Sequence, residues 1–278
     1  MDRSSAIGVC VAAGGILAGL MIDGGNIGQI LQPTAALIVF GGTIGAVMLQ
    51  FPMDVVVRAA KNVKKAFLYE EPDIPALIER IVGFAHKARK EGIVSLDKDL
   101  DAIPEPFLRK TLMLAVDGTQ PAELRDNMEL ALGNQSEAEE RCVQVFDAAG
   151  GYAPTVGIIG AILGLIQVMQ KLNNIDEVGR GIAVAFVATV YGVASANLCF
   201  LPIAGKLRVR RRQEDLMREI MLEGVIGILE GMNPRMLQTK LRGYLEDQPA
   251  GGKAKEAAAA DNDAEAPPAP ARAGSGAS

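Results

Sequence analysis

The sequence lacks several residue types on which common functional sites depend. Its 278 residues include no tryptophan, four tyrosines, one histidine and three cysteines. A single histidine and three scattered cysteines argue against a zinc centre or a disulfide framework. The 33 acidic residues outnumber the 28 basic ones, which excludes a strongly basic nucleic-acid-binding protein. With so few aromatic side chains, the protein is also a poor candidate for stacking against sugars or bases.

Charged residues are missing from four long stretches, at 4–22, 24–53, 148–170 and 181–205. A helix needs about 20 apolar residues to cross a bilayer core, and each charge at mid-membrane costs about 2.5–3.5 kcal/mol. The sequence therefore predicts an all-α integral membrane protein with four transmembrane helices. We expect these spans at roughly 4–22, 33–52, 153–170 and 181–204.

The distribution of basic residues predicts the orientation of the spans. Residues 54–153 contain 13 Lys and Arg and residues 205–278 contain 12, whereas the two short links between paired spans contain only Lys171 and Arg180. Because basic residues favour the cytoplasmic side, both termini and the large middle region are expected in the cytoplasm. The protein would then be a multi-pass membrane protein.

This topology divides the chain into five expected regions. They are transmembrane helices 1 and 2 in 1–53, a cytoplasmic helical domain in 54–150, transmembrane helices 3 and 4 in 151–205, cytoplasmic C-terminal helices in 206–247, and a tail in 248–278. The tail is rich in alanine, proline and glycine, so we expect it to be disordered.

Hydrophobic periodicity predicts helices in the cytoplasmic regions. In the first, Val55–Val57, Ala59, Ala60 and Val63 form an apolar face opposite Lys61, Lys64 and Lys65. Further helices are expected at about Ile74–Lys90, which Gly92 ends, at Pro106–Val116, and at Pro121–Phe146.

Two other patterns have more than one interpretation. Arginines at 208 and 210–212 form a basic collar after the fourth span, and such a cluster is typical of contact with anionic membrane lipid. Glycines spaced four apart let helices approach closely, either within one chain or between subunits. These pairs are Gly15/Gly19, Gly41/Gly45 and Gly160/Gly164.

No Asp, Glu, Lys, Arg or His lies inside the four predicted spans. A membrane protein that moves protons normally needs an ionisable group at depth, so here another chain would have to supply it. Neutral polar groups do occur in the second pair of spans, including Thr155, Thr189 and Tyr191, with Pro154 and Pro202 near the span ends. They either bond their own backbone or line a wet path. No motif of a soluble enzyme is present, so we expect neither an enzyme nor a bound cofactor.

Three segments in order resemble a known family. The fourth span reads Ala-Phe-Val-Ala-Thr-Val-Tyr-Gly over 185–192, with Pro202 ten residues on. The segment 153–165 contains Ala-Pro-Thr and then Gly-Ala-Ile-Leu-Gly-Leu, and 230–237 reads Glu-Gly-Met-Asn-Pro-Arg-Met-Leu. Over residues 1 to about 247 the chain resembles the A subunit of the bacterial flagellar motor stator, the MotA/PomA family.

The resemblance implies a fold, a location in the bacterial inner membrane and a mechanism. Five A subunits would form a homo-pentameric ring around a dimer of a MotB-like stator B subunit, which brings the proton-binding Asp. Ion flow would then drive torque on a FliG-like rotor switch protein. The residues that match the family's ion path and B-facing surface are Pro154, Thr155, Ala161, Thr189, Tyr191 and Pro202. Arg89 and Asp97 match its rotor-facing pair.

The resemblance leaves alternatives open. Sodium-driven relatives carry a Thr in the third span where this chain has Ala161, and loss of that oxygen ligand favours protons over a hard cation. A sodium-coupled stator is one alternative, and a TolQ/ExbB-like proton-driven energiser is another. A membrane scaffold or self-contained channel without a B partner is a third, and it predicts conductance from this chain alone.

Overall fold

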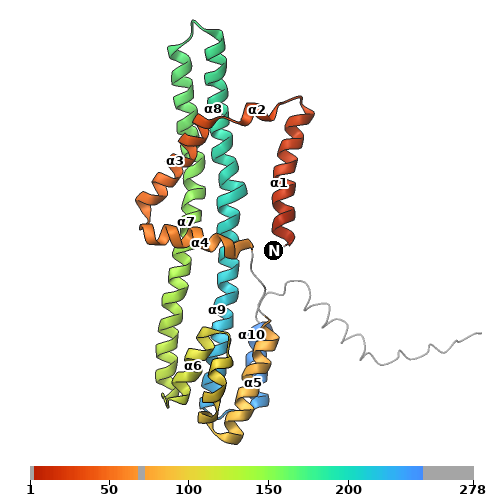
Figure 1. Cartoon of the computed structure of the whole chain (residues 1–278), viewed down its shortest axis with the longest axis vertical. Helices are drawn as coiled ribbons and strands as arrows, with labels where there is room; N and C mark the ends of the chain where they lie inside the picture. The colour runs from red at the N-terminus through yellow and green to blue at the C-terminus, as the bar shows by residue number, and fades with distance from the viewer. Residues whose placement is uncertain (1–2, 68–72, 247–278) are drawn as a thin grey trace, which may run out of the picture.

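The computed structural model describes residues 3–67 and 73–246, and every regular element in these ranges is helical. The long axis is formed by two very long antiparallel helical segments (Figure 1). The elements are α1 (Arg3–Ile22), α2 (Ile27–Ile30), α3 (Pro33–Gln50), α4 (Met53–Phe67), α5 (Ile74–Glu91), a 3₁₀ helix η1 (Ile93–Ala102), α6 (Pro106–Val116), α7 (Pro121–Gln170), α8 (Ile175–Ser195), a π-helical turn η2 (Ala196–Phe200), α9 (Leu201–Leu229) and α10 (Pro234–Glu246). The predicted tail at 248–278 lies outside the described residues.

α7 and α8 pack closely because small residues line their contact. A Cβ added to Gly192 would lie 2.5 Å from the carbonyl oxygen of Ala153, and one added to Gly157 would lie 2.9 Å from that of Ala188. Glycine at these positions therefore lets the two backbones touch, as is usual for helix pairs in membranes. Gly160 and Gly164 also face α8, so this glycine pair serves packing within the chain. The pairs in α1 and α3 meet no neighbour within 4 Å among the described residues.

The structure differs from the predicted helix boundaries at the ends of the predicted spans. We expected separate helices ending near Phe146 and starting near 153, but α7 is one helix of 50 residues with Pro154 inside it. Similarly, α8 and α9 are joined by the wide turn η2. Pro202 explains this turn, because it lacks an N–H and its ring would crowd the carbonyl four residues earlier. Both long segments thus run from apolar into charged sequence without a break.

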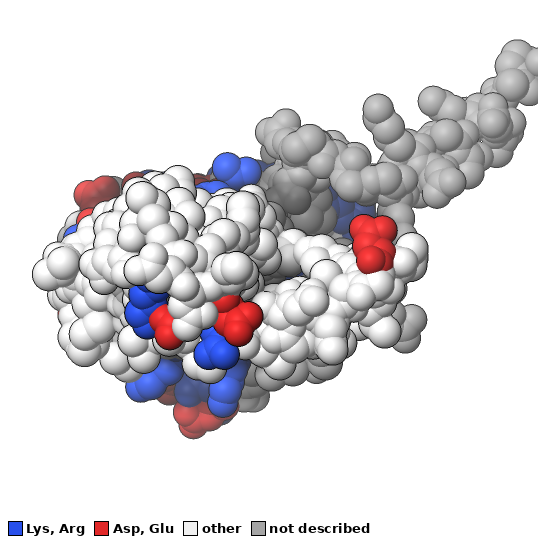
Figure 2. Space-filling view, turned by 90° about the horizontal axis from the view of Figure 1, so that it is seen from above, with Lys and Arg blue, Asp and Glu red and all other residues white. Residues whose placement is uncertain are grey.

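Three helical segments are long and apolar enough to cross a membrane, namely α3, α7 and the continuous segment from α8 to α9; the apolar part of α1, Ile7–Ile22, is shorter. α1 stands apart from the bundle and is joined to it through α2 (Figure 1). Large apolar side chains are exposed along all of these segments. Viewed from the tip of the α7–α8 hairpin, most of the surface is uncharged (Figure 2).

The other end of the molecule is a compact helical bundle with its own core. Buried side chains of α5, η1, α6, α7, α9 and α10 meet there, among them Ile81, Leu96, Leu108, Leu124 and Ile226. The predicted bounds of α5 and α6 are confirmed to within a residue. Gly92 ends α5 with a φ of 83°, a conformation that favours glycine.

Two arginines of the collar form ion pairs with carboxylates of α7. Arg208 of α9 pairs with Asp147 of α7 at 2.5 Å, and Arg211 pairs with Glu140 at 3.0 Å. Arg210 is buried. Because α7 supplies carboxylates at matching levels, Arg208 and Arg211 are neutralised within the chain, whereas Arg212 is exposed. Part of the collar that was predicted to contact lipid thus forms a row of ion pairs between α7 and α9.

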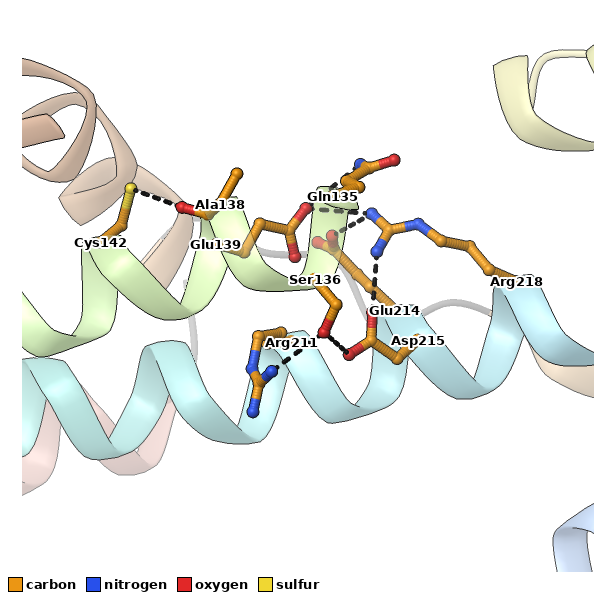
Figure 3. Close-up of polar contacts among 9 residues, drawn as sticks. All are labelled: Gln135, Ser136, Ala138, Glu139, Cys142, Arg211, Glu214, Asp215 and Arg218. Atoms are coloured by element: carbon orange, nitrogen blue, oxygen red, sulfur yellow. Dashed lines mark hydrogen bonds and ion pairs between the residues drawn. The ribbon is translucent and has the colours of Figure 1, made fainter. Parts of the chain in front are cut away.

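A second charge cluster, the Arg218 cluster, continues this row toward the bundle. The Arg218 side chain is 9% exposed and pairs with Glu139 of α7 at 3.1 Å, and with Glu214 and Asp215 of its own helix at 3.0 Å each. Ser136 of α7 donates a hydrogen bond to Asp215 at 2.9 Å. These side chains from α7 and α9 point toward one another (Figure 3). The cluster fixes the register of the two helices, since a one-turn slip would separate the pairs that join them.

A third group, centred on Glu223 of α9, ties α10 to the bundle. Arg125 of α7 and Lys240 of α10 donate hydrogen bonds to its two carboxylate oxygens, at 2.5 and 2.6 Å. Burial raises the pKa of Glu223, but the hydrogen bonds from Arg125 and Lys240 outweigh it and hold the pKa below its usual value. The folded state therefore favours the charged carboxylate.

This arrangement predicts a pH-dependent contribution to stability. The pKa of Glu223 is lower in the folded state than in the unfolded state. The charged carboxylate therefore contributes its full stabilisation above the unfolded pKa of about 4.3, and this stabilisation is lost as the pH falls through the folded pKa. Glu223→Gln should therefore lower the melting temperature of the solubilised protein at pH ~7, and the difference from the parent should shrink as the pH falls below about 4. Glu230→Gln, at an exposed position, is the control. A difference that stays constant across this range would contradict the assignment.

Candidate functional site

The hydroxyls predicted to line an ion path bond to their own helices. Thr155 donates to the carbonyl oxygen of Tyr152 at 2.8 Å, and Thr189 donates to that of Ala185 at 3.3 Å. Thr155 is exposed and Thr189 half-buried. Each hydroxyl keeps free lone pairs, so it could still accept a hydrogen bond from water or from a partner.

Tyr191 of α8 contacts the link that precedes α3. Its hydroxyl donates to the carbonyl oxygen of Ile30 at 2.6 Å and accepts from the amide of Gln32 at 3.3 Å. Its ring lies 6.1 Å from that of Phe40. The side chain therefore joins α8 to a segment far away in the sequence, and this contact has no signal in the sequence.

The remaining predicted path residues lie on α7 and α9. Pro154 is half-buried next to Ala153, whose carbonyl oxygen touches Gly192. Ala161 is half-buried and follows Gly160, which packs on Ala188. Pro202 is exposed in the first turn of α9. The structure thus places Pro154 and Ala161 directly after residues of the α7–α8 contact, and it leaves Pro202 exposed on α9.

The sequence analysis missed two polar features of α3. Tyr152 of α7 donates a hydrogen bond to Gln50, the last residue of α3, at 2.8 Å. Thr43 is buried, and its hydroxyl has no hydrogen-bond partner in the described part of the chain. A Thr in an apolar helix normally bonds the preceding turn, so the sequence held no sign that this hydroxyl stays unbonded.

Arg89 and Asp97 both lie on the surface of the bundle, at the end of α5 and in η1. Neither forms an ion pair with another described residue. Two neighbouring residues do pair, since Lys87 of α5 contacts Asp99 of η1 at 2.7 Å and so fixes η1 against α5. The two exposed charges are thus held on a rigid corner and stay available to a partner.

No group of His, Cys, Asp or Glu suited to a metal ion occurs within residues 3–67 and 73–246. The described apolar stretches also contain no ionisable carboxylate, imidazole, amine or guanidinium. The arrangement in the membrane helices is therefore one of close packing and neutral hydroxyls.

Comparison with known proteins agrees with this arrangement over most of the chain. The profile of the MotA/TolQ/ExbB proton channel family matches residues 99–220, and that of the Motility protein A N-terminal region matches residues 6–92. Motility protein A of Bacillus subtilis (strain 168) is 35% identical, covering 88% of this chain and 91% of its own length. Chemotaxis protein PomA of Vibrio alginolyticus is also 35% identical, covering 82% and 89%.

Solved structures show the same fold. The chain matches the structure of C. jejuni MotAB with a TM-score of 0.84 at 31% identity, covering 90% of this chain and 98% of the other. It matches the flagellar MotAB stator complex from Bacillus subtilis with a TM-score of 0.81 at 31% identity, covering 93% and 99%. The chain therefore belongs to the family of flagellar motor stator A subunits that includes Motility protein A and PomA, and this is a family of channel subunits rather than enzymes.

Proposed function

We propose that this chain is the A subunit of a flagellar motor stator and couples transmembrane proton flow to torque in bacterial motility. The observation that supports this most strongly is its agreement with two MotAB stator structures over at least 90% of its length. The match to the Motility protein A N-terminal region favours a stator over a TolQ/ExbB-like energiser.

The proton carrier would belong to a MotB-like B subunit. Proton movement across a membrane needs an ionisable group at depth, and the apolar stretches of this chain contain none. A carboxylate on the partner would complete the path. The partner would face the α7–α8 side of the chain, where Pro154, Thr155, Ala161 and Thr189 lie; Tyr191 and Pro202 would frame this path rather than touch the ion.

The assembly would be a pentamer of this chain around two B subunits, with four spans per chain and both termini in the cytoplasm. The exposed apolar side chains of α1, α3, α7 and α8 support this, because they need lipid or neighbouring subunits to cover them. Residues 54–150 and 206–247 would then be cytoplasmic. The membrane segments would be 1–53 and 151–205, with the boundaries lying inside continuous helices.

The rotor contact would be made at the corner of the bundle that carries Arg89 and Asp97. Both side chains are exposed and free of ion pairs in the described chain, which suits pairing with a charged surface of a FliG-like switch protein. The ion would be the proton, because the position of Ala161 offers no side-chain oxygen to a sodium ion.

Swimming of a flagellated strain without its own stators tests the function. We expect this chain, expressed with its B subunit, to restore swimming that stops with a protonophore and does not change with external sodium. Swimming that follows sodium would overturn the choice of ion. Absence of swimming, with both proteins present in the membrane, would favour the TolQ/ExbB-like energiser. Conductance from this chain alone would contradict the need for a B subunit.

The same strain tests the rotor contact. Arg89→Glu should greatly reduce swimming speed while membrane levels of both subunits stay unchanged, because the exposed charge has no structural partner to lose. A parallel loss of protein level would assign Arg89 a role in folding instead.

A further inference from the structure

The amphipathic helix α4 leaves one of its faces uncovered. Val55, Val56 and Ala59 turn inward and pack toward α7. Val57 and Met53, in contrast, are 44% and 57% exposed. The apolar face predicted from the sequence is therefore divided, and Val57 and Met53 lie on a second, outward strip.

Three cations of α4 also form no ion pair with another described residue. Arg58, Lys61 and Lys64 are exposed, and none of them forms an ion pair within residues 3–67 and 73–246. This contrasts with α9, where Arg208 and Arg211 are neutralised by carboxylates of α7. α4 thus carries three cations that the described chain leaves available close to the end of an apolar helix.

The position of α4 is that of a helix lying along a membrane surface. It begins at Met53, three residues after the apolar helix α3 ends at Gln50, and it runs across α7 and α9 rather than along them (Figure 1). A helix with apolar side chains on one side and basic ones beside them binds at the boundary of headgroups and acyl chains.

We propose that the outer face of α4, formed by Met53, Val57, Arg58, Lys61 and Lys64, binds anionic phospholipid headgroups of the cytoplasmic leaflet and enriches them around the protein. The two apolar side chains of this face, Met53 and Val57, form too small a surface to bind a partner helix, but they can insert between acyl chains. Three unpaired cations complement negative headgroups, and basic residues near an anionic surface each contribute about fivefold in affinity, equivalent to ~1 kcal/mol. The inference rests on the membrane placement in the proposed function.

The absence of tryptophan from the chain permits a direct test. Val57→Trp places the only tryptophan of this chain on the outer face of α4, and the emission of the parent complex with the same B subunit is subtracted. Leu37→Trp places a tryptophan on α3, at a side chain that is 77% exposed near the opposite end of that span. Each full-length variant with its B subunit is reconstituted in vesicles of equal amounts of phosphatidylcholine and phosphatidylglycerol, with bromines on the acyl chains of one lipid or the other.

We expect brominated phosphatidylglycerol to quench the Val57→Trp variant severalfold more strongly than brominated phosphatidylcholine, and the two lipids to quench the Leu37→Trp variant equally. Equal quenching of the Val57→Trp variant by both lipids would overturn the inference and leave the proposed function intact. Quenching of the Leu37→Trp variant alone would overturn it too, by showing that protein, such as a second copy of the chain, covers α4. No quenching of either variant would instead contradict the membrane placement itself.

A variant that lacks the three cations tests their contribution to the lipid preference. In the Val57→Trp background, Arg58→Gln/Lys61→Gln/Lys64→Gln should remove the preference for phosphatidylglycerol. Lys110→Gln/Arg235→Gln/Arg242→Gln changes the charge equally in the distant bundle and should leave the preference unchanged.

If the α4 charge variant fails to fold, salt provides the test in the Val57→Trp variant alone. The preference for phosphatidylglycerol should fall between 0.1 M and 1 M salt, as the Debye length drops from about 10 Å to about 3 Å. A preference insensitive to salt would overturn the electrostatic basis of the inference.

Discussion

Gly192→Leu is expected to abolish torque by separating α7 from α8. At this position even a Cβ would lie 2.5 Å from the carbonyl oxygen of Ala153 and 3.1 Å from the Cα of Gly157. Both atoms belong to the backbone, so no side-chain rotation can relieve the clash. Overpacking of this kind costs about 1–3 kcal/mol and sometimes more, and a whole leucine side chain places the cost at the upper end.

The measurement is the membrane level of the variant, its retention of the B subunit and the swimming speed. All three should fall together, because the α7–α8 contact forms the proposed B-facing surface. Gly179→Leu is the matched control, since Gly179 lies on the same helix and meets nothing within 4 Å in the described chain. Normal swimming of the Gly192→Leu variant would show that the two helices are farther apart in the working assembly.

Arg218→Ala should be the most destabilising of the charge removals along α9. It removes the one cation that Glu139, Glu214 and Asp215 share, and these side chains are only 18–21% exposed. Breaking a buried ion pair by removing one partner costs about 3–5 kcal/mol. Because the three carboxylates retain some contact with water, we expect a value near the lower limit, about 3 kcal/mol.

Thermal unfolding of the solubilised protein measures this loss. Arg212→Ala serves as the control, because Arg212 is exposed and has no ion pair within the described residues; it should change stability by less than about 0.5 kcal/mol. Arg218→Lys should lie between the two, since lysine keeps the charge but cannot reach three carboxylates with a planar fork. Equal melting temperatures for the Arg218→Ala and Arg212→Ala variants would contradict the prediction.

The parts of the fold that depend on local sequence could be predicted. Gly92 and Pro106 restrict or permit backbone conformations within a few residues of themselves. The structure accordingly ends α5 just before Gly92 and begins α6 at Pro106. The continuity of α7 could not be predicted in this way. Gly150, Gly151 and Pro154 are residues that weaken a helix, yet Gly150 is tightly covered by Leu201. Contact with a segment far along the chain thus outweighs the local preference.

The site shows the same division. The residue types alone showed that Thr155 and Thr189 are polar groups in apolar helices. The resemblance to the family indicated Arg89 and Asp97 as candidates for the rotor contact. The partners of charged and aromatic groups remained hidden, because pairs such as Tyr191 with Ile30 or Arg208 with Asp147 join positions far apart in the sequence. A cluster of arginines has the same appearance whether it faces lipid headgroups or a neighbouring acidic helix.

The continuity of α7 has a mechanical consequence. A helix of 50 residues is about 75 Å long at 1.5 Å per residue. α9 runs beside α7 in the opposite direction, and ion pairs connect the two helices. The ion pairs between the two helices oppose sliding, because a shift of one helix along the other would separate them. A tilt of a few degrees at the α7–α8 packing surface would be magnified into a displacement of several ångströms at the far end. The corner that carries Arg89 and Asp97 would then move together with the apolar helices, so that a small displacement of these helices produces a larger displacement of the corner.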